Sequence, residues 1–303
     1  MIPATHEPAE RMNALPRWRP AQFVLASLIL HLACLVTLTL RLELWPWILG
    51  VLACNHFAVF AAVLLPRGSI LGSNLVRLPD SAARRRQVAL TFDDGPDPDV
   101  TPQVLALLDQ YQAKASFFCI GEKAAAHPDI VGEIARRGHS VENHSYSHPH
   151  AFSFLAFSWL RREVELAQSV IAGITGRPPR YFRAPAGFRG PFLDAELARH
   201  GMQYASWTRR GFDTVSMNPA RVLQRLTRGL AAGDVLLLHD GMHARTDARA
   251  PLVLAVLPAL LEHLAARGLR SVSLPTACNA DLPAQAAAAT AAVRHTERQH
   301  WHA

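Results

Sequence analysis

Two long apolar stretches dominate the N-terminal part of the chain. Residues 21–40 and residues 44–65 are each about the length of one bilayer crossing, and a very short charged turn separates them. Trp45 and Trp47 stand at the start of the second stretch, where indole rings suit a membrane interface. This pattern predicts a helical transmembrane hairpin. A pair of buried core helices, or a signal peptide in place of the first span, is the alternative.

From residue 87 onward, short apolar runs alternate with stretches of helical periodicity. The runs expected to form strands are 88–92, 115–120, 139–142, 181–183, 203–206, 235–238 and 270–274. Helices are expected between most of them, at 101–112, 159–174, 219–231 and 252–266. Because strands that alternate with helices form parallel sheets, we predict an α/β fold whose sheet is closed, or nearly closed, into a barrel.

The composition agrees with a membrane part attached to a folded domain. The chain has 303 residues, of which 50% are hydrophobic and 18% are charged, and this excludes a disordered protein. The length allows one large or two modest domains with an ample core. The four cysteines form no CxxC pair and no metal-ligand spacing, so they do not require an oxidising compartment.

The basic charge is concentrated in one segment. There are 31 Lys and Arg residues against 24 Asp and Glu, a formal net charge of +7. Over half of this excess lies in residues 66–86, where Asp80 is the single acid among five arginines: Arg67, Arg77, Arg84, Arg85 and Arg86. The segment directly follows an apolar stretch, so anionic lipid head groups are better partners for it than nucleic acid. With no nucleic-acid fold signature and no basic stripe with interleaved aromatics, we expect no nucleic-acid binding.

The arginines also predict which side of the membrane the barrel occupies. Arg11, Arg17 and Arg19 precede the first span, the arginines of residues 66–86 follow the second, and the turn between the spans holds only Arg41. The positive-inside rule then places the N-terminus and the barrel on the cytoplasmic side of a bacterial-type inner (plasma) membrane. If the first span were a signal peptide, the barrel would instead be exported.

These expectations divide the chain into five parts. They are a cytoplasmic N-terminal segment (1–20), two transmembrane helices (21–65), a basic linker (66–86), the barrel domain (87–276) and an Ala-rich tail (277–303) that we expect to be disordered.

Potentially reactive side chains follow the predicted strands. They are Asp93 and Asp94 after the first strand, His144 and His148 after the third, Arg183 at the end of the fourth, Asp213 after the fifth and His239 at the end of the sixth. In a barrel of parallel strands, the loops converge at the C-terminal rim. We therefore expect carboxylates, imidazoles and a guanidinium to meet at that rim.

A divalent metal site is the simplest use of these residues. His144 and His148 are four residues apart, a spacing that would place both imidazoles on one face of a helical turn. Together with one carboxylate they make a set that binds a divalent metal and leaves positions open for water and substrate. The adjacent Asp93 and Asp94 allow one carboxylate to bind the metal while the other acts as a base. The metal expected first is Zn2+, with Co, Ni, Mn or Fe as alternatives.

Four ordered motifs carry a family resemblance. They are Thr-Phe-Asp-Asp-Gly-Pro at 91–96, His-Ser-Tyr-Ser-His at 144–148, Arg-Ala-Pro-Ala-Gly at 183–187 and Leu-Leu-His at 237–239. Their order and spacing resemble those of the polysaccharide deacetylase family, the NodB-homology or family 4 carbohydrate esterases, over about two thirds of the chain. The resemblance implies a distorted (β/α)7 barrel and metal-dependent removal of an N- or O-acyl group from a sugar.

The resemblance also implies roles for the motif residues. Asp94, His144 and His148 match the metal ligands, and Asp93 matches the general base that activates the attacking water. Arg183 matches the arginine that orients this base and keeps it ionised.

Further roles follow for the residues around the scissile bond. The backbone N–H of Ala186 would hold the oxyanion, and His239 matches the acid that protonates the leaving amine. Asp213 matches the carboxylate that holds this histidine charged and oriented. Leu237 would line the acyl pocket, and Trp207 belongs to the substrate-binding residues.

The sequence departs from the family pattern in the expected substrate pocket. The run from Trp207 to Thr214 resembles Trp-Ser-x-Asp-x-x-Asp-Trp, but Arg210 stands where an Asp is usual and Thr214 where an aromatic is usual. Ala186 replaces an aromatic that usually follows the proline. The chemistry is therefore expected to be intact and the pocket altered. Arg209 and Arg210 would either meet a phosphate or form a solvated basic turn.

Other residues near the motifs are expected to have lesser roles. His139, His150 and His243 suit supporting or surface positions better than metal ligation. Four aromatics follow the histidine motif, namely Phe152, Phe154, Phe157 and Trp159, and we expect core packing for them rather than a membrane-facing patch.

The sequence thus predicts a membrane-anchored, metal-dependent deacylase. Its substrate would be an N-acyl, first of all N-acetyl, group on a sugar or a lipid-linked glycan. An exported deacetylase of peptidoglycan or another polysaccharide, and a non-catalytic glycan-binding barrel, are the alternatives.

Overall fold

The computed structural model describes residues 18–242, 244–246 and 250–279. The arginines at 11 and 17, His243 and the Ala-rich tail beyond residue 279 lie outside the described residues.

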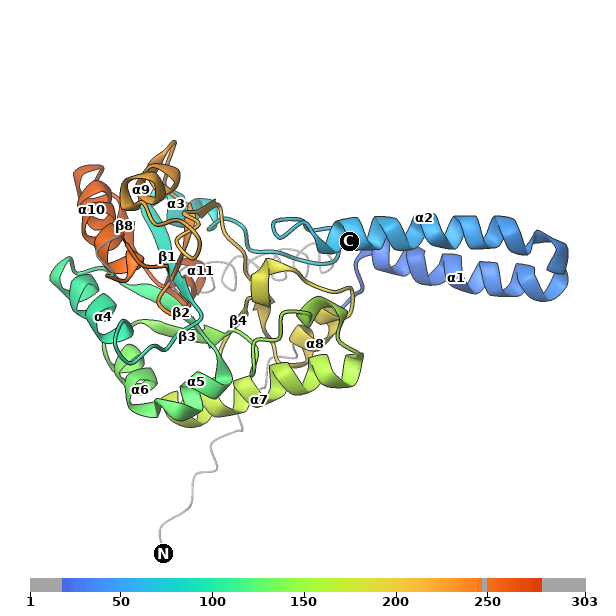
Figure 1. Cartoon of the computed structure of the whole chain (residues 1–303), viewed down its shortest axis with the longest axis horizontal. Coiled ribbons are helices and arrows are strands. Elements are labelled where there is room, and N and C mark those ends of the chain that lie inside the picture. The colour runs from blue at the N-terminus through green and yellow to red at the C-terminus, as the bar shows by residue number, and fades with distance from the viewer. Residues whose placement is uncertain (1–17, 243, 247–249, 280–303) are drawn as a thin grey trace, which may run out of the picture.

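Two apolar helices project as a hairpin from one side of a rounded domain (Figure 1). Helix α1 (Gln22–Leu40) and helix α2 (Trp45–Val63) are joined by the short helix η1 (Leu42–Leu44). The stretches Gln22–Leu40 and Leu42–Val63 have mean hydropathies of 2.4 and 1.7, and only 6% and 11% of their most apolar parts are buried. Both helices are therefore long and apolar enough to cross a membrane, and they present apolar side chains outward.

The domain is built on one parallel sheet of eight strands within the described residues. The strands are β1 (Gln87–Asp93), β2 (Ala115–Cys119), β3 (Ser140–Asn143), β4 (Tyr181–Phe182), β5 (Gln203–Tyr204), β6 (Arg209–Arg210), β7 (Val235–His239) and β8 (Arg270–Ser271). Their order is β5-β4-β3-β2-β1-β7-β6, and β8 pairs with β1. Because all pairs are parallel, the loops after the central strands lie at one end of the sheet.

Helices surround this sheet, most of them on its outer face (Figure 1). They are α3 (Asp80–Arg84), α4 (Thr101–Gln110), α5 (Gly121–Ala126), α6 (Pro128–Arg136), α7 (Phe157–Thr175), α8 (Leu193–Arg199), α9 (Pro219–Thr227), α10 (Leu252–Ala266) and α11 (Leu274–Asn279), with the short helices η2 (Phe152–Phe154) and η3 (Pro185–Gly187). The predicted parallel, barrel-type α/β fold that follows a helical hairpin is confirmed.

The period of two along β1 separates its two faces. Val88, Leu90 and Phe92 belong to the main hydrophobic core beneath the helices, whereas Ala89 belongs to a smaller cluster inside the sheet. The same alternation places Thr91 and Asp93 on the inner face. A strand that is apolar outward can thus carry a catalytic carboxylate inward at its C-terminal end.

The chain between the hairpin and β1 bridges two separate parts of the sheet. In this closing segment (residues 71–78), the backbone N–H of Leu75 donates to the Tyr204 carbonyl on β5 at 2.9 Å. The N–H of Leu78 donates to the Gly233 carbonyl just before β7, also at 2.9 Å. The part of the chain expected to be a linker therefore packs as an integral part of the barrel.

Several arginines of this part of the chain bind the barrel itself. Arg77 forms an ion pair with the buried Asp234, and the Arg86 side chain donates to the Gly268 carbonyl at 3.1 Å. The carboxamide of Gln87 accepts from Arg85 at 3.2 Å. These guanidinium groups stabilise the fold, which leaves less of the local positive charge for lipid head groups.

Strand β6 was not among the predicted strands. It consists of Arg209 and Arg210, which pair with Leu236 and Leu237 at the edge of the sheet. Charged residues are common on edge strands, because they discourage pairing with another chain, and they hide the apolar alternation that would reveal the strand. All seven predicted strands are present: β1 and β7 are slightly longer than predicted, β3 is shifted by one residue, and the other four are shorter.

Candidate active site

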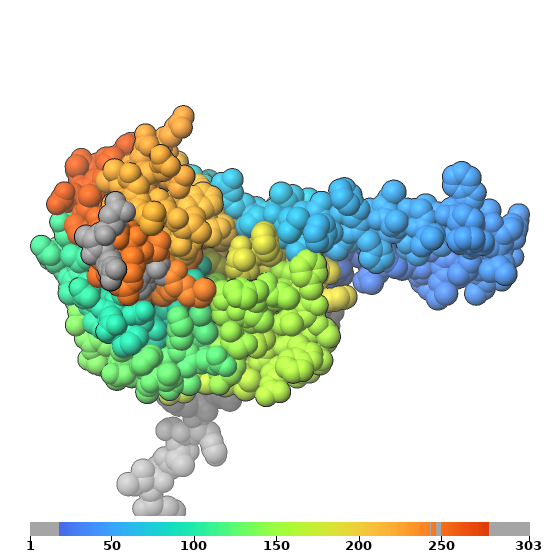
Figure 2. All heavy atoms as spheres, viewed as in Figure 1, coloured from blue at the N-terminus to red at the C-terminus, as the bar shows by residue number. Residues whose placement is uncertain are grey.

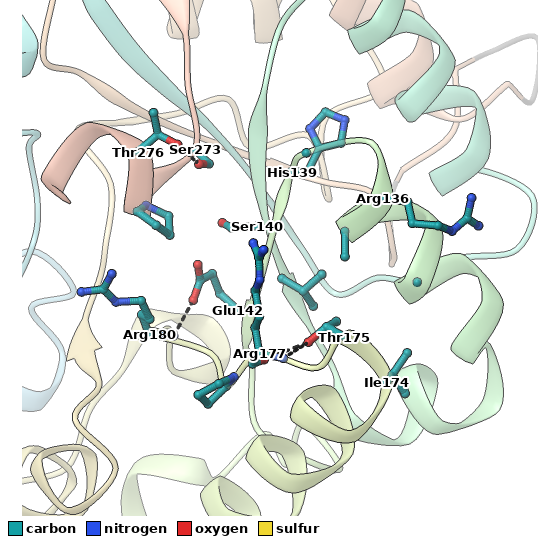
Figure 3. Close-up of a pocket in the computed structure, with 16 residues that line it drawn as sticks. Arg136, His139, Ser140, Glu142, Ile174, Thr175, Arg177, Arg180, Ser273 and Thr276 are labelled. Carbon is teal, nitrogen blue, oxygen red and sulfur yellow. Dashed lines mark hydrogen bonds between the residues drawn. The ribbon is translucent and has the colours of Figure 1, made fainter. Parts of the chain in front are cut away.

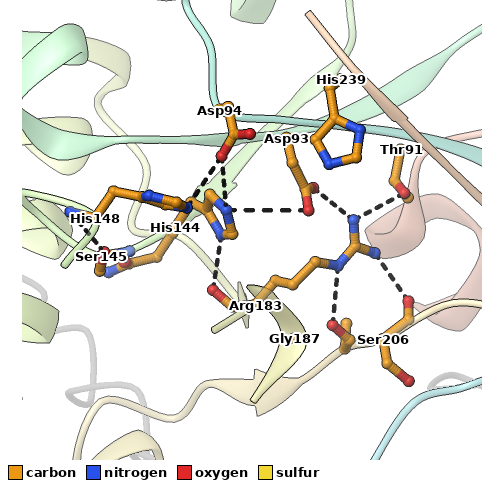
Figure 4. Close-up of polar contacts among 12 residues, drawn as sticks. Thr91, Asp93, Asp94, His144, Ser145, His148, Arg183, Gly187, Ser206 and His239 are labelled. Carbon is orange, nitrogen blue, oxygen red and sulfur yellow. Dashed lines mark hydrogen bonds and ion pairs between the residues drawn. The ribbon is translucent and has the colours of Figure 1, made fainter. Parts of the chain in front are cut away.

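Asp93, the last residue of β1, is buried and held by a guanidinium group. Arg183 follows β4, and its Nη1 donates to Asp93 Oδ1 at 2.6 Å and to Thr91 Oγ1 at 2.9 Å. Its Nε and Nη2 donate to the carbonyl oxygens of Ala205 and Ser206 at 3.1 and 2.8 Å. Arg183 is completely buried and always charged, so it offsets the cost of burying the Asp93 carboxylate and fixes its orientation (Figure 4).

The neighbouring carboxylate of Asp94 faces two imidazoles (Figure 4). Asp94 Oδ1 lies 3.2 Å from His144 Nε2 and 3.1 Å from His148 Nε2. Burial alone would raise the pKa of Asp94, but the two imidazoles outweigh burial and hold this pKa well below its usual range. The structure thus brings the three predicted metal ligands together.

The contacts of His144 suit a cation between its ring and the Asp94 carboxylate. His144 Nδ1 lies 2.8 Å from the Arg183 carbonyl, and since a carbonyl only accepts, Nδ1 carries a hydrogen. In the neutral ring, Nε2 then directs a lone pair at the Asp94 carboxylate, which is favourable only with a proton or a metal ion between them. Ligands about 2.0–2.2 Å from a zinc ion lie roughly 3 Å apart, which agrees with the spacing of this set. The residues therefore fit a divalent metal.

The two histidines converge without a helix, so that part of the prediction was wrong. The segment after β3 is a loop in which Ser145 and His148 have positive φ values of 62° and 53°. The buried carboxylate of Glu163, on α7, accepts from the backbone N–H groups of Tyr146 and Ser147 at 3.0 and 2.8 Å. Because these N–H groups are satisfied by a side chain, the loop can adopt a compact non-helical form that turns both imidazoles inward.

A second acid–base pair lies across the site. His239, the last residue of β7, places Nδ1 2.9 Å from Asp213 Oδ1, and its backbone N–H donates to Asp213 Oδ2 at 2.8 Å. Burial lowers the pKa of His239, but the completely buried Asp213 beside it outweighs burial and raises this pKa above its ordinary value. Asp213 therefore favours the charged form of this imidazole, whose Nε2 is left to face the site.

Replacing Asp213 by Asn is expected to shift the pH dependence of deacylation. The charged form of His239 exists below its pKa, and Asp213 raises that pKa, so loss of the carboxylate moves the alkaline limb of kcat to lower pH. A pH–rate profile of the variant against the unchanged protein measures this limb. An alkaline limb that stays in place would show that another group acts as the acid.

The residues predicted to bind substrate lie around this rim at different depths. Leu237 is buried on β7, in register between Thr91 and Arg210. Ala186 is exposed in η3 with a positive φ of 57°. Trp207 is only 6% exposed, and its ring leaves no room for a side chain at Gly187, where a Cβ would lie 2.4 Å from the indole.

The two neighbouring arginines on β6 have different environments. Arg209 Nε lies 2.5 Å from Asp234 Oδ2, so both expectations for Arg209, a phosphate contact and a solvated turn, were wrong. The Arg210 guanidinium instead lies 5.4 Å from the Trp207 ring and 5.0 Å from the Phe212 ring. Its buried Nε has no hydrogen-bond partner among the described residues. Arg210 alone is therefore available to a ligand.

The aromatic residues after the histidine motif do not pack together in the core. Phe152 is buried and stacks on Phe182 at 5.5 Å, as expected. Phe154, Phe157 and Trp159 are 63%, 43% and 60% exposed, so the prediction of core packing was wrong for these three.

Two buried supports of the site were not identified from the sequence. Thr91 shares the inner face of β1 with Asp93, and the period of two could have indicated it. Asp240 follows His239 and accepts from Thr101 Oγ1 at 2.5 Å. Burial raises the pKa of Asp240 to about 7. A Cβ at Gly95 would lie 2.4 Å from this carboxylate, so Gly95 lets the Asp94 loop pass close to the loop after β7.

A cavity of about 650 Å³ lies away from the candidate active site, beside the N-terminal ends of β3 and β4 (Figure 3). Burial raises the pKa of Glu142 there to about 7, and its Oε2 accepts from the N–H groups of Arg180 and Tyr181. Burial also lowers the pKa of His139 to about 4, and its Nδ1 accepts from the Ala115 N–H. Both groups satisfy the backbone, so this cavity has no comparable set of reactive groups.

One further group of potential ligands lies between α7 and α8. Glu165, Glu196 and His200 have ligand atoms within 4.8 Å of one another. Arg161 binds Glu165 at 2.8 Å, and His200 binds Glu196 at 3.1 Å. These contacts are those of an ion-pair network between neighbouring turns of each helix, in which Glu196 is buried.

Comparison with known proteins agrees with this geometry. A family model described as polysaccharide deacetylase matches residues 80–205. A peptidoglycan-N-acetylglucosamine deacetylase of Bacillus cereus is 31% identical over 194 residues, which cover 62% of this chain and 85% of the relative. A chitooligosaccharide deacetylase of a Bradyrhizobium species is 34% identical over 157 residues, which cover 52% of this chain and 71% of the relative.

The fold is similar to that of solved enzymes as well. The crystal structure of a peptidoglycan N-acetylglucosamine deacetylase superposes with a TM-score of 0.62 and 26% sequence identity. The superposition covers 68% of this chain and 92% of that chain, so the similarity spans nearly all of the solved protein.

Proposed function

Because this chain belongs to the polysaccharide deacetylase family, and is therefore a hydrolase of amide carbon–nitrogen bonds in glycans, we propose that it is a membrane-anchored, metal-dependent deacylase of N-acylated amino sugars. The observation that carries this proposal is the convergence of three groups at one rim of the sheet. They are the Asp93–Arg183 pair, the group of Asp94, His144 and His148, and the His239–Asp213 pair.

Asp94, His144 and His148 would hold the metal, with zinc as the first candidate. A metal ion bound there supplies a Lewis acid and lowers the pKa of a bound water to about 7. The set of two imidazoles and one carboxylate leaves positions open for this water and for the substrate.

Asp93 is proposed as the general base. It takes a proton from the water whose oxygen attacks the amide carbonyl, forming a new carbon–oxygen bond. Arg183 donates to Oδ1 of this carboxylate, so Oδ2 is the atom left to accept the proton. The position of Oδ2, 4.0 Å from His144 Nε2, keeps it beside the metal ligands.

The acid and the oxyanion donor lie on the loops around the base. The N–H of Ala186 is proposed to donate to the carbonyl oxygen as it gains negative charge. His239 gives the proton on Nε2 to the amide nitrogen while the carbon–nitrogen bond breaks, which releases the free amine and the acid. Asp213 supports this step by stabilising the charged imidazole, and the inward side chain of Leu237 limits the size of the acyl group.

The substrate class is proposed from what lies between the site and the hairpin. A cavity of about 330 Å³ is lined by Pro66, Arg67, Trp207, Thr208, Arg210 and Phe212. Pro66 comes only three residues after α2 ends, so this cavity would open at the membrane surface. An amino sugar linked through phosphate to a lipid would place its phosphate near Arg67 and Arg210. We infer that such a lipid-linked sugar is the substrate.

The side of the membrane is proposed from the positive charge near the hairpin ends. Arg41, the single arginine of the turn, forms an ion pair with Glu43, whereas Arg19 and the arginines after residue 66 flank the other end. This distribution favours a barrel on the cytoplasmic side. The substrates named for the relatives favour a second candidate, an exported enzyme that deacetylates peptidoglycan or another polysaccharide.

The test of this proposal combines metal removal with a substrate panel. Membranes containing the full chain are incubated with a lipid-linked N-acetylamino sugar, chitooligosaccharides or peptidoglycan, and the released acid is identified by mass spectrometry. We expect acid from the lipid-linked sugar, loss of activity with a chelator and its return with zinc. His148→Ala should lose both bound metal and activity, whereas His150→Ala, an exposed neighbour, should keep both.

Two outcomes would contradict parts of the proposal separately. Acid release that survives both the chelator and His148→Ala would contradict the metal-dependent mechanism. Acid released only from the polymers, together with protease digestion of the barrel in intact spheroplasts rather than in inverted vesicles, would favour the exported enzyme.

A further inference from the structure

Four large aromatic side chains are exposed on the side of the domain from which the hairpin projects. The aromatic face consists of Phe154 of η2, Phe157 and Trp159 in the first turn of α7, and Phe192 just before α8. Their exposed fractions are 63%, 43%, 60% and 53%. A soluble surface rarely leaves so many large apolar side chains in water at one place, so a partner for this face is expected.

Direct contacts tie the aromatic face to the hairpin. The Phe154 ring stacks on the ring of Phe60, on α2, with centroids 6.1 Å apart. Phe157 and Phe192 form an edge-to-face pair at 6.4 Å. Apolar surface of the hairpin therefore meets apolar surface of the barrel at Phe154, at the junction that Figures 1 and 2 show.

The position of Phe60 fixes the depth of this face relative to a bilayer. Phe60 lies three residues before Val63, the last residue of α2, which is about 4–5 Å inside the end of the helix at 1.5 Å per residue. If α2 crosses the membrane, Phe154 must lie at the same depth, within the interfacial layer. No rearrangement is needed to bring it there.

Packing at the base of the hairpin fixes the position of the barrel relative to the two apolar helices. Ala62 and Val63 pack in a buried cluster with Leu71, and Phe188 packs against that cluster. Ser153 Oγ, next to Phe154, donates to the Phe188 carbonyl at 2.7 Å. The η2 helix and the hairpin base are thus joined through one loop, which fixes the tilt of the barrel.

The direction of α7 brings the rest of the aromatic face to the same level. In Figure 1, α7 runs roughly along the direction of the hairpin, and its contacts with α5 and α6 place its other end far from the hairpin. The first turn of α7 is therefore at the hairpin end of the helix, where its exposed residues Phe157 and Trp159 are on the side of the barrel nearest the bilayer. The Arg162 guanidinium lies 6.0 Å from the Trp159 ring, an arrangement in which the indole meets the interface and the cation meets lipid phosphate.

We propose that the aromatic face inserts into the interfacial layer of the bilayer that the hairpin spans, as a second membrane contact that sets the orientation of the barrel. This inference rests on the proposed membrane insertion of the hairpin. It adds a lipid surface as a partner of the catalytic domain itself.

Trp159 is a native probe for this contact. The full chain is reconstituted in vesicles of phosphatidylcholine with phosphatidylglycerol, with or without bromine on the upper part of the acyl chains. The fluorescence of Trp159 is obtained by subtracting the tryptophan fluorescence of Trp159→Phe from that of the unchanged protein, and we call the result the Trp159 difference. We expect brominated lipid to lower this difference about twofold or more, because indoles at head-group level contact the upper acyl chains.

Matched variants show whether the aromatic face acts as a unit. Replacing Phe154, Phe157 and Phe192 together by Ser should remove most of the Trp159 quenching. Leu166→Ser is the control, because Leu166 is an exposed apolar residue of α7 that lies about 13 Å further along the helix than Phe157. This control should leave the quenching unchanged.

The remaining indoles separate failure of this inference from failure of the anchor. Trp159→Phe keeps Trp45 and Trp47 at the tip of the hairpin, so bromine should still quench its emission if the hairpin is inserted. Quenching of Trp159→Phe without quenching of the Trp159 difference overturns the aromatic contact alone. If the Trp159 difference changes with protein concentration but is the same in brominated and unbrominated lipid, the aromatic face binds a second copy of the chain. That outcome also overturns the proposal. Absence of quenching in every variant overturns the anchor.

Discussion

Replacing Asp93 by Asn is expected to lower kcat by about 10²–10⁴-fold, the usual contribution of a general base. The amide has nearly the same shape as the carboxylate, and its oxygen can still accept from Arg183 Nη1, which lies 2.6 Å from Oδ1 in the unchanged protein. It cannot take a proton from water, because an amide nitrogen has no basic lone pair. The variant should therefore keep the geometry of the site and its metal and lose its chemistry, with some loss of stability because the buried Arg183 charge is left without a carboxylate.

Steady-state kinetics of the full chain, with metal content measured on the same sample, checks this expectation. Asp99→Asn is the matched control, because Asp99 is an exposed aspartate on the loop after β1. Its kcat should be unchanged. If the kcat of Asp93→Asn, like that of Asp99→Asn, stays within a few-fold of the value for the unchanged protein, another group must be the base.

Replacing Arg183 by Met is expected to destabilise the domain by roughly 3–5 kcal/mol, the cost of leaving one partner of a buried ion pair behind. The side chain is completely buried, so water cannot take its place beside Asp93. The Ala205 and Ser206 carbonyls lose their donor at the same time. Thermal or denaturant unfolding of the full chain in detergent measures the change.

A double variant separates the charge effect from the loss of packing. Asp93→Asn combined with Arg183→Met removes both charges, so it should be more stable than Arg183→Met alone. Arg177→Met is the control, because Arg177 lies on the connection that precedes β4, and as an exposed substitution it should change stability by about 0.5 kcal/mol or less. If Arg183→Met and the double variant are equally stable, Arg183 does not stabilise the domain by compensating the buried charge of Asp93.

The sequence predicted the fold well where hydrophobic alternation is strong. The long strands β1, β2 and β7 are runs of apolar residues whose inner and outer faces alternate, and helix α10 was predicted with its observed bounds. Strand β6 was missed because it is two arginines, which a local pattern assigns to solvent. Its existence depends on pairing with β7, a contact between residues far apart in the chain.

The sequence predicted which residues form the site more accurately than it predicted their backbone conformation. Reactive residues that follow parallel strands must share one rim, so their convergence is a consequence of topology. The histidine spacing suggested a helical turn, but Glu163 satisfies the loop N–H groups and makes a different backbone favourable. No local signal links Glu163 to residues 144–148, since the two segments meet only through packing of α7.

The aromatic residues show a third kind of limit. Phe152 and Phe154 are two positions apart in similar surroundings, yet one is buried and the other is 63% exposed. Phe152 stacks on the buried Phe182, whereas Phe154 stacks on Phe60, which is itself exposed on the apolar surface of α2. The exposure of such a residue depends on the surroundings that distant parts of the chain create. Composition and periodicity along the sequence do not describe those surroundings.

The closing segment determines how the catalytic domain can search for substrate. Leu71 packs against the end of α2, and Leu75 and Leu78 then bond to two separate parts of the barrel, so the described chain between hairpin and barrel leaves no free tether along which the domain could swing. An enzyme on a long flexible tether samples a hemisphere of space above its anchor. This rim would instead stay at one height and one tilt, and it would meet substrates by lateral diffusion in the plane of the membrane. Its selectivity would then depend on how far a glycan extends from the lipid surface, in addition to which acyl group it carries.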